Sequence, residues 1–113
     1  HVNHNVALTY LEEGRDAFLR ERGITRDNYV VGRCSLTFER EISPSFGSVI
    51  VQCEVAELGR SSVTTSERIL DPAGTALVEG SFGLVLWDPD DGAPRPISVE
   101  ERAALGGAEG AGA

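Results

Sequence analysis

The chain has 113 residues, of which 41% are hydrophobic, so we expect it to fold as one domain around a single small core. Its 18 acidic and 10 basic side chains give a net charge of -8, which argues against a general affinity for nucleic acid or anionic membranes. No apolar run reaches the roughly 20 residues of a membrane span, and the two cysteines, Cys34 and Cys53, predict reduced, buried thiols in a cytoplasmic protein.

The first predicted element is an amphipathic helix from Asn5 to Arg22, where apolar residues recur every three or four positions. Asn3 or Asn5 can cap its start, and Gly23 is the expected stop. A glycine inside the apolar stripe, Gly14, indicates close packing of the helix against a sheet. We expect the enclosed face to consist of Ala7, Tyr10, Leu11, Gly14 and Phe18.

After the helix the apolar pattern alternates with a period of two, which is typical of half-buried strands. Strands are predicted at 30–39, 48–58, 61–70 and 75–88, arranged as an antiparallel meander. Gly59, with a positive φ, and the turn at 71–74 are expected to connect three of them. The inward side chains should be Val30, Cys34, Leu36, Phe38, Val49, Val51, Cys53, Val55, Ala76, Val78, Phe82, Leu84 and Leu86.

The C-terminal region contains a helix signal, since Ser98 and Glu101 fit a capping box for a short helix running to about Leu105. The domain is therefore predicted to span 1–105, followed by a flexible Gly/Ala tail at 106–113. Four strands and one long helix cannot cover both faces of a sheet, so we expect one face or edge to meet another subunit.

No single residue pattern identifies a reaction. His1 and His4 have helical spacing, but the sequence places no third ligand, so no metal is predicted. Ser61 and Ser62 follow Arg60 with no base in evidence, and they are interpreted as polar strand residues. Glu12 and Glu13 are interpreted as solvated helix charges, with Glu13 nearer to the buried stripe. The sequence contains no phosphate loop, nucleophile elbow or CxxC pair.

The stretch "HVNHNVALTYLEEGRDAFLRERGI", followed by "VVGRCSLTFEREISPSFGSVIVQCEVAELGRSS", resembles the hotdog-fold acyl-CoA thioesterases of the 4-hydroxybenzoyl-CoA thioesterase-like group. In that family a motif of the form D-x-D-x-x-G-H-V-N-N leads from a first strand into a central helix. Residues 1–3 match its H-V-N, His4 takes the place of the next N, and Glu12 with Glu13 resembles a pair of acids found further along the helix. The chain starts at His1 and lacks Met, so we expect the first strand and the catalytic acid upstream of it.

The resemblance implies an α+β hotdog fold, in which an antiparallel sheet wraps around a long central helix. It implies an acyl-CoA thioesterase that needs no cofactor, with a site shared between two protomers of a homodimer or homotetramer. Backbone N–H groups at the helix start would stabilise an oxyanion. The predicted catalytic residues are His1, Asn3, His4, Asn5 and Glu13. Arg60 is predicted to bind a CoA phosphate, with Ser61 and Ser62 near the pantetheine arm.

Two other functions remain open at the sequence level. A non-catalytic acyl-CoA-binding or dimer-forming hotdog domain would need no catalytic acid. A hotdog hydratase or dehydratase would need a histidine and an acid facing each other in the cleft, for which only His1 and His4 are available. The acyl chain is not specified by any of these residues.

Overall fold

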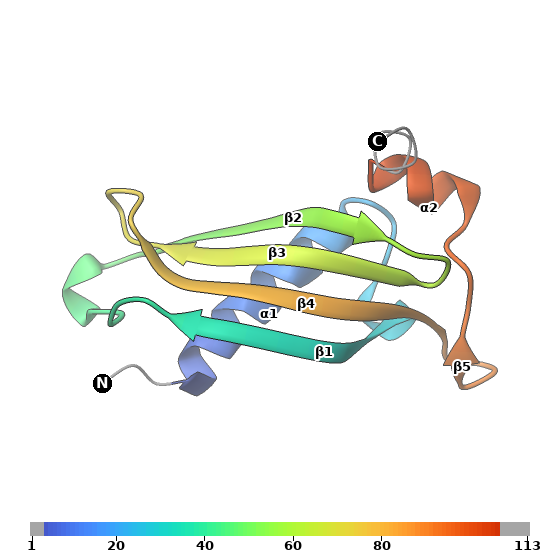
Figure 1. Cartoon of the computed structure of the whole chain (residues 1–113), viewed down its shortest axis with the longest axis horizontal. Coiled ribbons are helices and arrows are strands. Elements are labelled where there is room, and N and C mark those ends of the chain that lie inside the picture. The colour runs from blue at the N-terminus through green and yellow to red at the C-terminus, as the bar shows by residue number, and fades with distance from the viewer. Residues whose placement is uncertain (1–3, 107–113) are drawn as a thin grey trace.

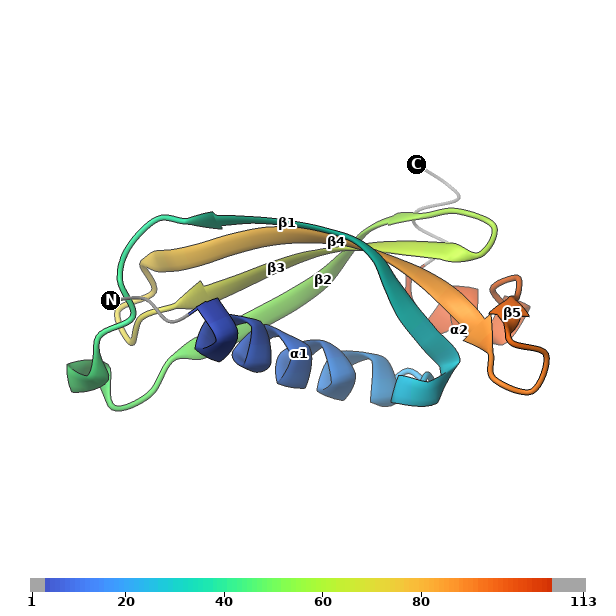
Figure 2. The ribbon, with the colours of Figure 1, turned by 90° about the horizontal axis from the view of Figure 1, so that it is seen from below.

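The computed structural model describes residues 4–106, so the predictions for His1, Asn3 and 107–113 lie outside the described residues. A long helix lies against one face of a curved antiparallel sheet (Figures 1 and 2). In chain order the elements are α1 (His4–Arg20), η1 (Arg26–Asn28), β1 (Tyr29–Phe38), η2 (Pro44–Phe46), β2 (Ile50–Leu58), β3 (Ser62–Leu70), β4 (Ala76–Asp88), β5 (Ala93–Pro94) and α2 (Val99–Ala104). None of the helices in the described part is long and apolar enough to cross a membrane.

Helix α1 ends at the predicted glycine. Gly23 has a φ of 84°, and its N–H donates to the carbonyl of Arg20 at 3.1 Å, while the N–H of Ile24 donates to Leu19 at 3.0 Å. These two bonds form a Schellman motif, which satisfies carbonyls at the end of the helix. The prediction of Gly23 as the stop is confirmed, although regular helix ends two residues before Arg22.

The buried face of α1 differs from the predicted one. Ala7, Leu11 and Leu19 are buried as apolar residues, but Tyr10 is 37% exposed, so its predicted burial is wrong. The face turned to the sheet follows a four-residue spacing that includes Arg15. Gly14 is pressed against β2, because a Cβ at this position would lie 2.5 Å from Cγ1 of Val51. This contact confirms the predicted close approach of helix and sheet.

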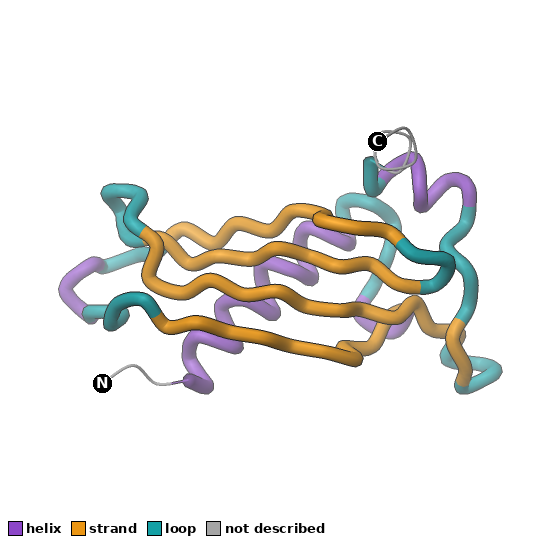
Figure 3. The backbone as a smooth tube through the Cα atoms, viewed as in Figure 1, coloured by secondary structure: helices purple, strands orange, loops and turns teal. Residues whose placement is uncertain are grey.

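The strand order is β1-β4-β3-β2, with β5 paired to the end of β4. The predicted antiparallel meander is confirmed for β2, β3 and β4, which pair in chain order. The predicted place of β1 is wrong, since β1 pairs with β4, where Tyr29 lies opposite Leu86 and Phe38 opposite Val78. The connection after β1 carries the chain across the end of the sheet to β2, which lies at the opposite edge (Figure 1). Figure 3 shows that the loops lie at the two ends of the strands. β1 and β2 are therefore the two long edges.

Strand β1 is less buried than its sequence pattern predicts. The register shifts between Val31 and Arg33, and this irregularity reverses the side-chain alternation. Tyr29 is buried, Leu36 and Phe38 are half-buried, and Val30 and Cys34 are exposed. The predictions that Val30 faces inward and that Cys34 is a buried thiol are thus wrong. Both cysteines are free, as predicted.

Strands β2 to β4 have the predicted inward side chains, with Val51, Cys53, Val55 and Ala76 half-buried and Val78, Phe82, Leu84 and Leu86 buried. The turn at 71–74 is confirmed, since Gly74 has a φ of 91°. A positive φ at Gly59 was predicted and is absent. A side chain there would instead collide with Oγ of Ser62. Helix α2 begins with the predicted capping box of Ser98 and Glu101.

Candidate active site

The start of α1 is joined to the end of β1 by an aromatic contact. The ring of His4 stacks on Phe38 with 4.3 Å between the centroids and 17° between the planes. The first turn of the helix contains no acidic residue. The first backbone N–H groups of a helix have no acceptor within it, and they form the positive end of the helix dipole. This end of α1 can therefore stabilise a developing negative charge.

An apolar hollow of about 330 Å³ lies beside the helix start. It is lined by Asn5, Val6, Thr9 and Tyr10, and the Oγ1 of Thr9 donates to the carbonyl of Asn5 at 2.8 Å. Val6 is 41% exposed. A hydrocarbon chain could contact these side chains while a polar group lies at the end of the helix.

Glu13 is exposed on α1 and lies nine residues after His4, about 14 Å further along the helix axis. Because consecutive residues turn by about 100°, it points about 200° away from the buried Arg15. The structure therefore does not bring Glu13 to the helix start within one protomer.

Arg60 and Ser61 lie in the turn between β2 and β3, and Ser62 begins β3, at the end of the sheet opposite to the start of α1 (Figure 1). The backbone of this turn is fixed at several points. The N–H of Ile97 donates to the carbonyl of Arg60, and the N–H of Leu86 donates to that of Ser61, both at 2.8 Å. Arg60 is exposed. Within one protomer the predicted catalytic and substrate-binding residues are thus separated.

The C-terminal segment supports the same turn. Arg102 donates from Nη2 to the carbonyl of Gly59 at 2.8 Å. Arg95 donates two hydrogen bonds to the carboxylate of Glu101, each at 2.7 Å. These bonds from Arg95, together with those from Ser98, lower the pKa of Glu101 to about 2. Arg102 thus holds the turn directly, while the Arg95–Glu101 pair holds α2, the helix that carries Arg102.

A buried ion pair joins α1 to the centre of the sheet. Arg15 donates from Nε to Oε2 of Glu67 at 2.8 Å and from Nη2 to Oε1 at 3.0 Å. Thr65 donates to the same carboxylate at 2.5 Å, and the guanidinium lies 4.0 Å above the ring centroid of Phe82. Glu67 is 1% exposed. Sequence reasoning missed this pair, although Glu67 lies on the inward phase of β3 and Arg15 follows Leu11 by four residues.

A second polar network involves Asp16, which is also buried. The hydroxyl of Tyr29 donates to Oδ1 of Asp16, and Arg26 donates from Nε to Oδ2 at 2.8 Å. Burial, followed by the bond to Asp16, raises the pKa of Tyr29 well above its usual value. Tyr29 therefore stays protonated at neutral pH and ties α1 to the start of β1.

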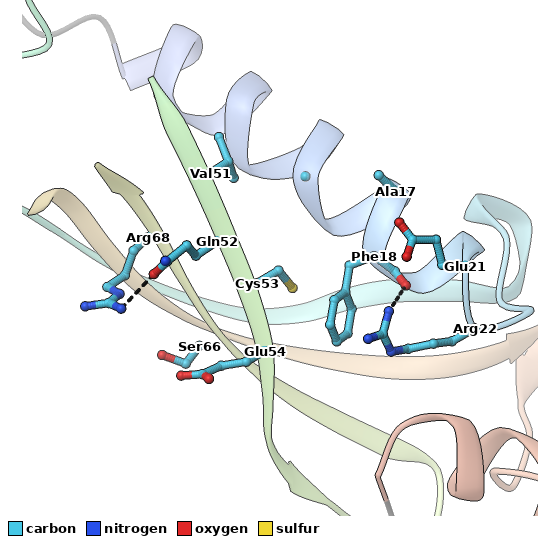
Figure 4. A pocket seen from close by; sticks show the side chains of 11 residues that line it. Ala17, Phe18, Glu21, Arg22, Val51, Gln52, Cys53, Glu54, Ser66 and Arg68 are labelled. Carbon is cyan, nitrogen blue, oxygen red and sulfur yellow. Dashed lines mark hydrogen bonds between the residues drawn. The ribbon is translucent and has the colours of Figure 1, made fainter. Parts of the chain in front are cut away.

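A larger groove of about 600 Å³ lies along the β2 edge, between β2 and the C-terminal half of α1 (Figure 4). Arg22 donates to the carbonyl of Phe18 at 2.8 Å, and Arg68 donates to Gln52 at 2.7 Å. Burial, with a smaller effect of Glu67, raises the pKa of the Cys53 thiol to about 12, so this sulfur is a poor nucleophile. Of the predicted site residues that the structure describes, none lines the groove. We therefore place the candidate active site at the start of α1.

We find no candidate metal-binding site in the described part of the chain. Among residues 4–106 no cluster of three or more His, Cys, Asp or Glu side chains could hold a metal ion. His4 contributes its ring to the stack on Phe38.

Residues 1–77 match the model of the thioesterase superfamily, and this match covers more than half of the chain. Together with the sheet and helix described above, it defines the class as a hotdog-fold protein. The chain belongs to the thioesterase superfamily. The predicted family and fold class are thus confirmed. A comparison with curated proteins finds no match.

Solved structures show the same fold. The chain is 28% identical to a thioesterase from Thermus thermophilus that was crystallised with coenzyme A and Zn, with a TM-score of 0.79 over 97% of this chain and 82% of that one. A predicted thioesterase from Bacillus stearothermophilus is 21% identical, with a TM-score of 0.80 and coverage of 95% and 82%. A thioesterase superfamily protein from Jannaschia sp. CCS1 is 23% identical, with a TM-score of 0.78 and coverage of 93% and 70%.

Proposed function

We propose that this protein is an acyl-CoA thioesterase, which hydrolyses an acyl-CoA thioester to the free acid and CoA. The observation that carries the proposal is membership of the thioesterase superfamily, supported by the structure of a 28% identical thioesterase with coenzyme A. The start of α1 adds a physical reason, because it combines an anion-stabilising helix end with an apolar hollow.

In the proposed mechanism the thioester carbonyl lies at the start of α1. Attack by water or by a carboxylate places negative charge on the carbonyl oxygen, and the first backbone N–H groups of the helix stabilise that charge. His4, held by Phe38, forms one wall of the site, while Asn5 lines the adjoining hollow. The first turn supplies no carboxylate. The proposal therefore assigns the acid to the family motif that precedes this turn, with Glu13 as the alternative.

The proposed partner is a second copy of the chain, joined along the β1 edge. Val30 and Val31 are 38% and 45% exposed on that edge, and Val6, Leu8 and Tyr10 are exposed on the first turns of α1. Figure 1 shows these turns extending beyond β1. The two apolar surfaces face the same side of the molecule but lie at opposite ends of β1, since Phe38 at the end of the strand meets His4 and Tyr29 at its start meets Asp16. A contact along the whole β1 edge would cover both. The resulting homodimer could also form half of a homotetramer.

This dimer would place the predicted substrate-binding residues of one subunit and the predicted catalytic residues of the other at the same end of the joined sheet. Antiparallel pairing of two β1 strands reverses the direction of the partner's sheet. The β2–β3 turn of one subunit would then lie at the same end of the joined sheet as the start of the other subunit's α1. In this arrangement Arg60 binds a CoA phosphate, with Ser61 and Ser62 beside the pantetheine arm. A cytoplasmic location, suggested by the free cysteines, belongs to the same proposal.

The test is thiol release from short-chain, long-chain and aromatic acyl-CoAs. We expect hydrolysis of at least one of them, and we expect Arg60→Ala to raise KM several-fold with little change in kcat, because a phosphate contact binds substrate and transition state alike. Arg20→Ala removes a similarly exposed positive charge from the end of α1 and should leave both constants unchanged. CoA binding without thiol release from any substrate would favour the non-catalytic hotdog domain.

A further inference from the structure

Apolar contacts alone fix the position of α1 on the sheet poorly. Ala7, Leu11 and Leu19 are fully buried beneath it, but apolar burial has no preferred direction. Such contacts hold the helix on the sheet, but they lack the bond directions that a hydrogen bond imposes. Directional contacts are needed to select one position. Asp16 ties the C-terminal half of α1 to Tyr29 at the start of β1, and Arg15 joins the middle of α1 to the centre of the sheet.

The Arg15–Glu67 pair supplies that direction. Two parallel hydrogen bonds, at 2.8 and 3.0 Å, constrain both the distance and the plane of the guanidinium. Thr65 fixes the carboxylate from within β3, and Phe82 on β4 supports the guanidinium from below. Glu67 lies opposite Cys53 of β2 and Gly80 of β4, in the interior of the sheet. A shift of α1 by one residue would break both bonds.

We infer that Arg15 and Glu67 are positioning residues, which set where the start of α1 meets the substrate. The inference rests on the proposed thioesterase function and identifies residues on which that site depends. His4 lies eleven residues before Arg15, about 16 Å along a continuous helix. A rigid helix transmits a displacement at Arg15 to its first turn, and a misplacement of about 1 Å can lower a rate by about 100-fold.

Stability alone is a weak explanation of this pair. Removing two charged groups from water is costly, and replacing a buried ion pair with apolar residues of similar size is often neutral or stabilising. A buried polar contact is better supported as a way to select one packing arrangement of two elements than as a source of net stability. An apolar replacement of the pair can therefore preserve the stability of the protein while it changes the position of α1, and an experiment can measure the two effects separately.

The experiment compares wild type with the double variant Arg15→Met/Glu67→Leu, which fills the same space without charge. We expect its Tm to equal or exceed that of wild type, while kcat falls about 10- to 100-fold and KM changes much less. Ile69→Val, on the same face of β3, is the control for an altered core and should keep kcat. A double variant that is stable and has wild-type kcat would overturn the inference.

Two further measurements keep the test independent of folding and of the proposed reaction. Arg15→Lys keeps the charge but cannot form the two-bond fork, so an intermediate kcat is expected. The NMR signals of the His4 ring, assigned by comparison with His4→Gln, report its stacking on Phe38. We expect them to shift in the double variant. Unchanged signals would overturn the inference, whereas inactivity of wild type would overturn only the proposed function.

Discussion

The two halves of α1 are attached to the protein in different ways. In the C-terminal half Arg15 and Asp16 are buried and hydrogen-bonded to the sheet, and a Schellman motif closes the last turn. In the N-terminal half Val6, Leu8 and Tyr10 are exposed. The C-terminal half is therefore complete within one chain, while the N-terminal half offers surface to a ligand or a partner. One helix thus combines an end fixed to the sheet with the end at which we propose the active site.

We expect the largest loss of stability when only one partner of the buried Arg15–Glu67 pair is removed. Glu67→Ala leaves the Arg15 guanidinium buried without its partner, so we expect a loss of about 3–5 kcal/mol in the free energy of unfolding, measured with urea. Leu8→Ala in the N-terminal half is the comparison, and it should cost much less because Leu8 is 39% exposed. Equal losses would contradict the distinction between the two halves.

A smaller effect is expected at the point where the two halves meet. Gly14→Ala gains about 1 kcal/mol of helix propensity, but overpacking against Val51 typically costs about 1–3 kcal/mol. We expect a net loss of about 1 kcal/mol in thermal or urea unfolding. Adding Val51→Ala should recover part of it, because the smaller side chain removes the clash. If the second substitution adds its full cost instead, the helix does not press on β2 at this point.

The next prediction concerns Glu101 in the first turn of α2, where its carboxylate bonds to Arg95 and Ser98. The pKa of Glu101 is lowered to about 2 in the folded state from an ordinary value of 4.5, mainly by Arg95. Its stabilising contribution is therefore complete above about pH 4.5 and is lost as the pH falls towards 2. We expect Glu101→Gln to cost about 0.5–1 kcal/mol at pH 7 and nothing near pH 2. Glu100→Gln, on the same turn, should show a weaker pH dependence.

The smallest effect on folding, and the largest on assembly, is expected at the β1 edge. Val31→Lys changes an exposed residue, so the free energy of unfolding of the protomer should move by no more than about 0.5 kcal/mol. Light scattering should nevertheless show the mass of one protomer in place of two. Ile50→Lys is a matched control, since Ile50 is 44% exposed on the opposite edge, β2. Dissociation by Ile50→Lys alone would move the proposed interface to β2.

Turns and helix ends were predictable from the sequence where a particular residue type favours one backbone conformation. Gly23, the turn at 71–74 and the capping box of Ser98 and Glu101 were all found from sequence, because each depends on a few neighbouring residues. The position of β1 in the strand order was not predictable in this way. Alternating apolar residues indicate which side of a strand is buried, but they do not indicate its neighbours, so the pairing of β1 with β4 could not be predicted.

The buried polar residues were missed for a different reason. Charged side chains are almost never fully buried without a partner, and a partner 52 positions away cannot be recognised in one sequence. The sequence analysis therefore assigned no role to Arg15, Asp16 or Glu67. The roles predicted for His4, Asn5, Glu13 and Arg60 rest on family resemblance, and they await the measurements described above.

The two cysteines differ in a way that has a practical use. Cys34 is exposed on β1, whereas Cys53 is half-buried, with its thiol pKa raised to about 12. The thiolate is the form that attacks an alkylating reagent, so Cys53 should react slowly at neutral pH while Cys34 remains accessible to the reagent. The unaltered sequence can thus carry a single fluorescent label on β1. Because that strand forms the proposed interface, the rate of labelling would also report directly on whether a second subunit covers it.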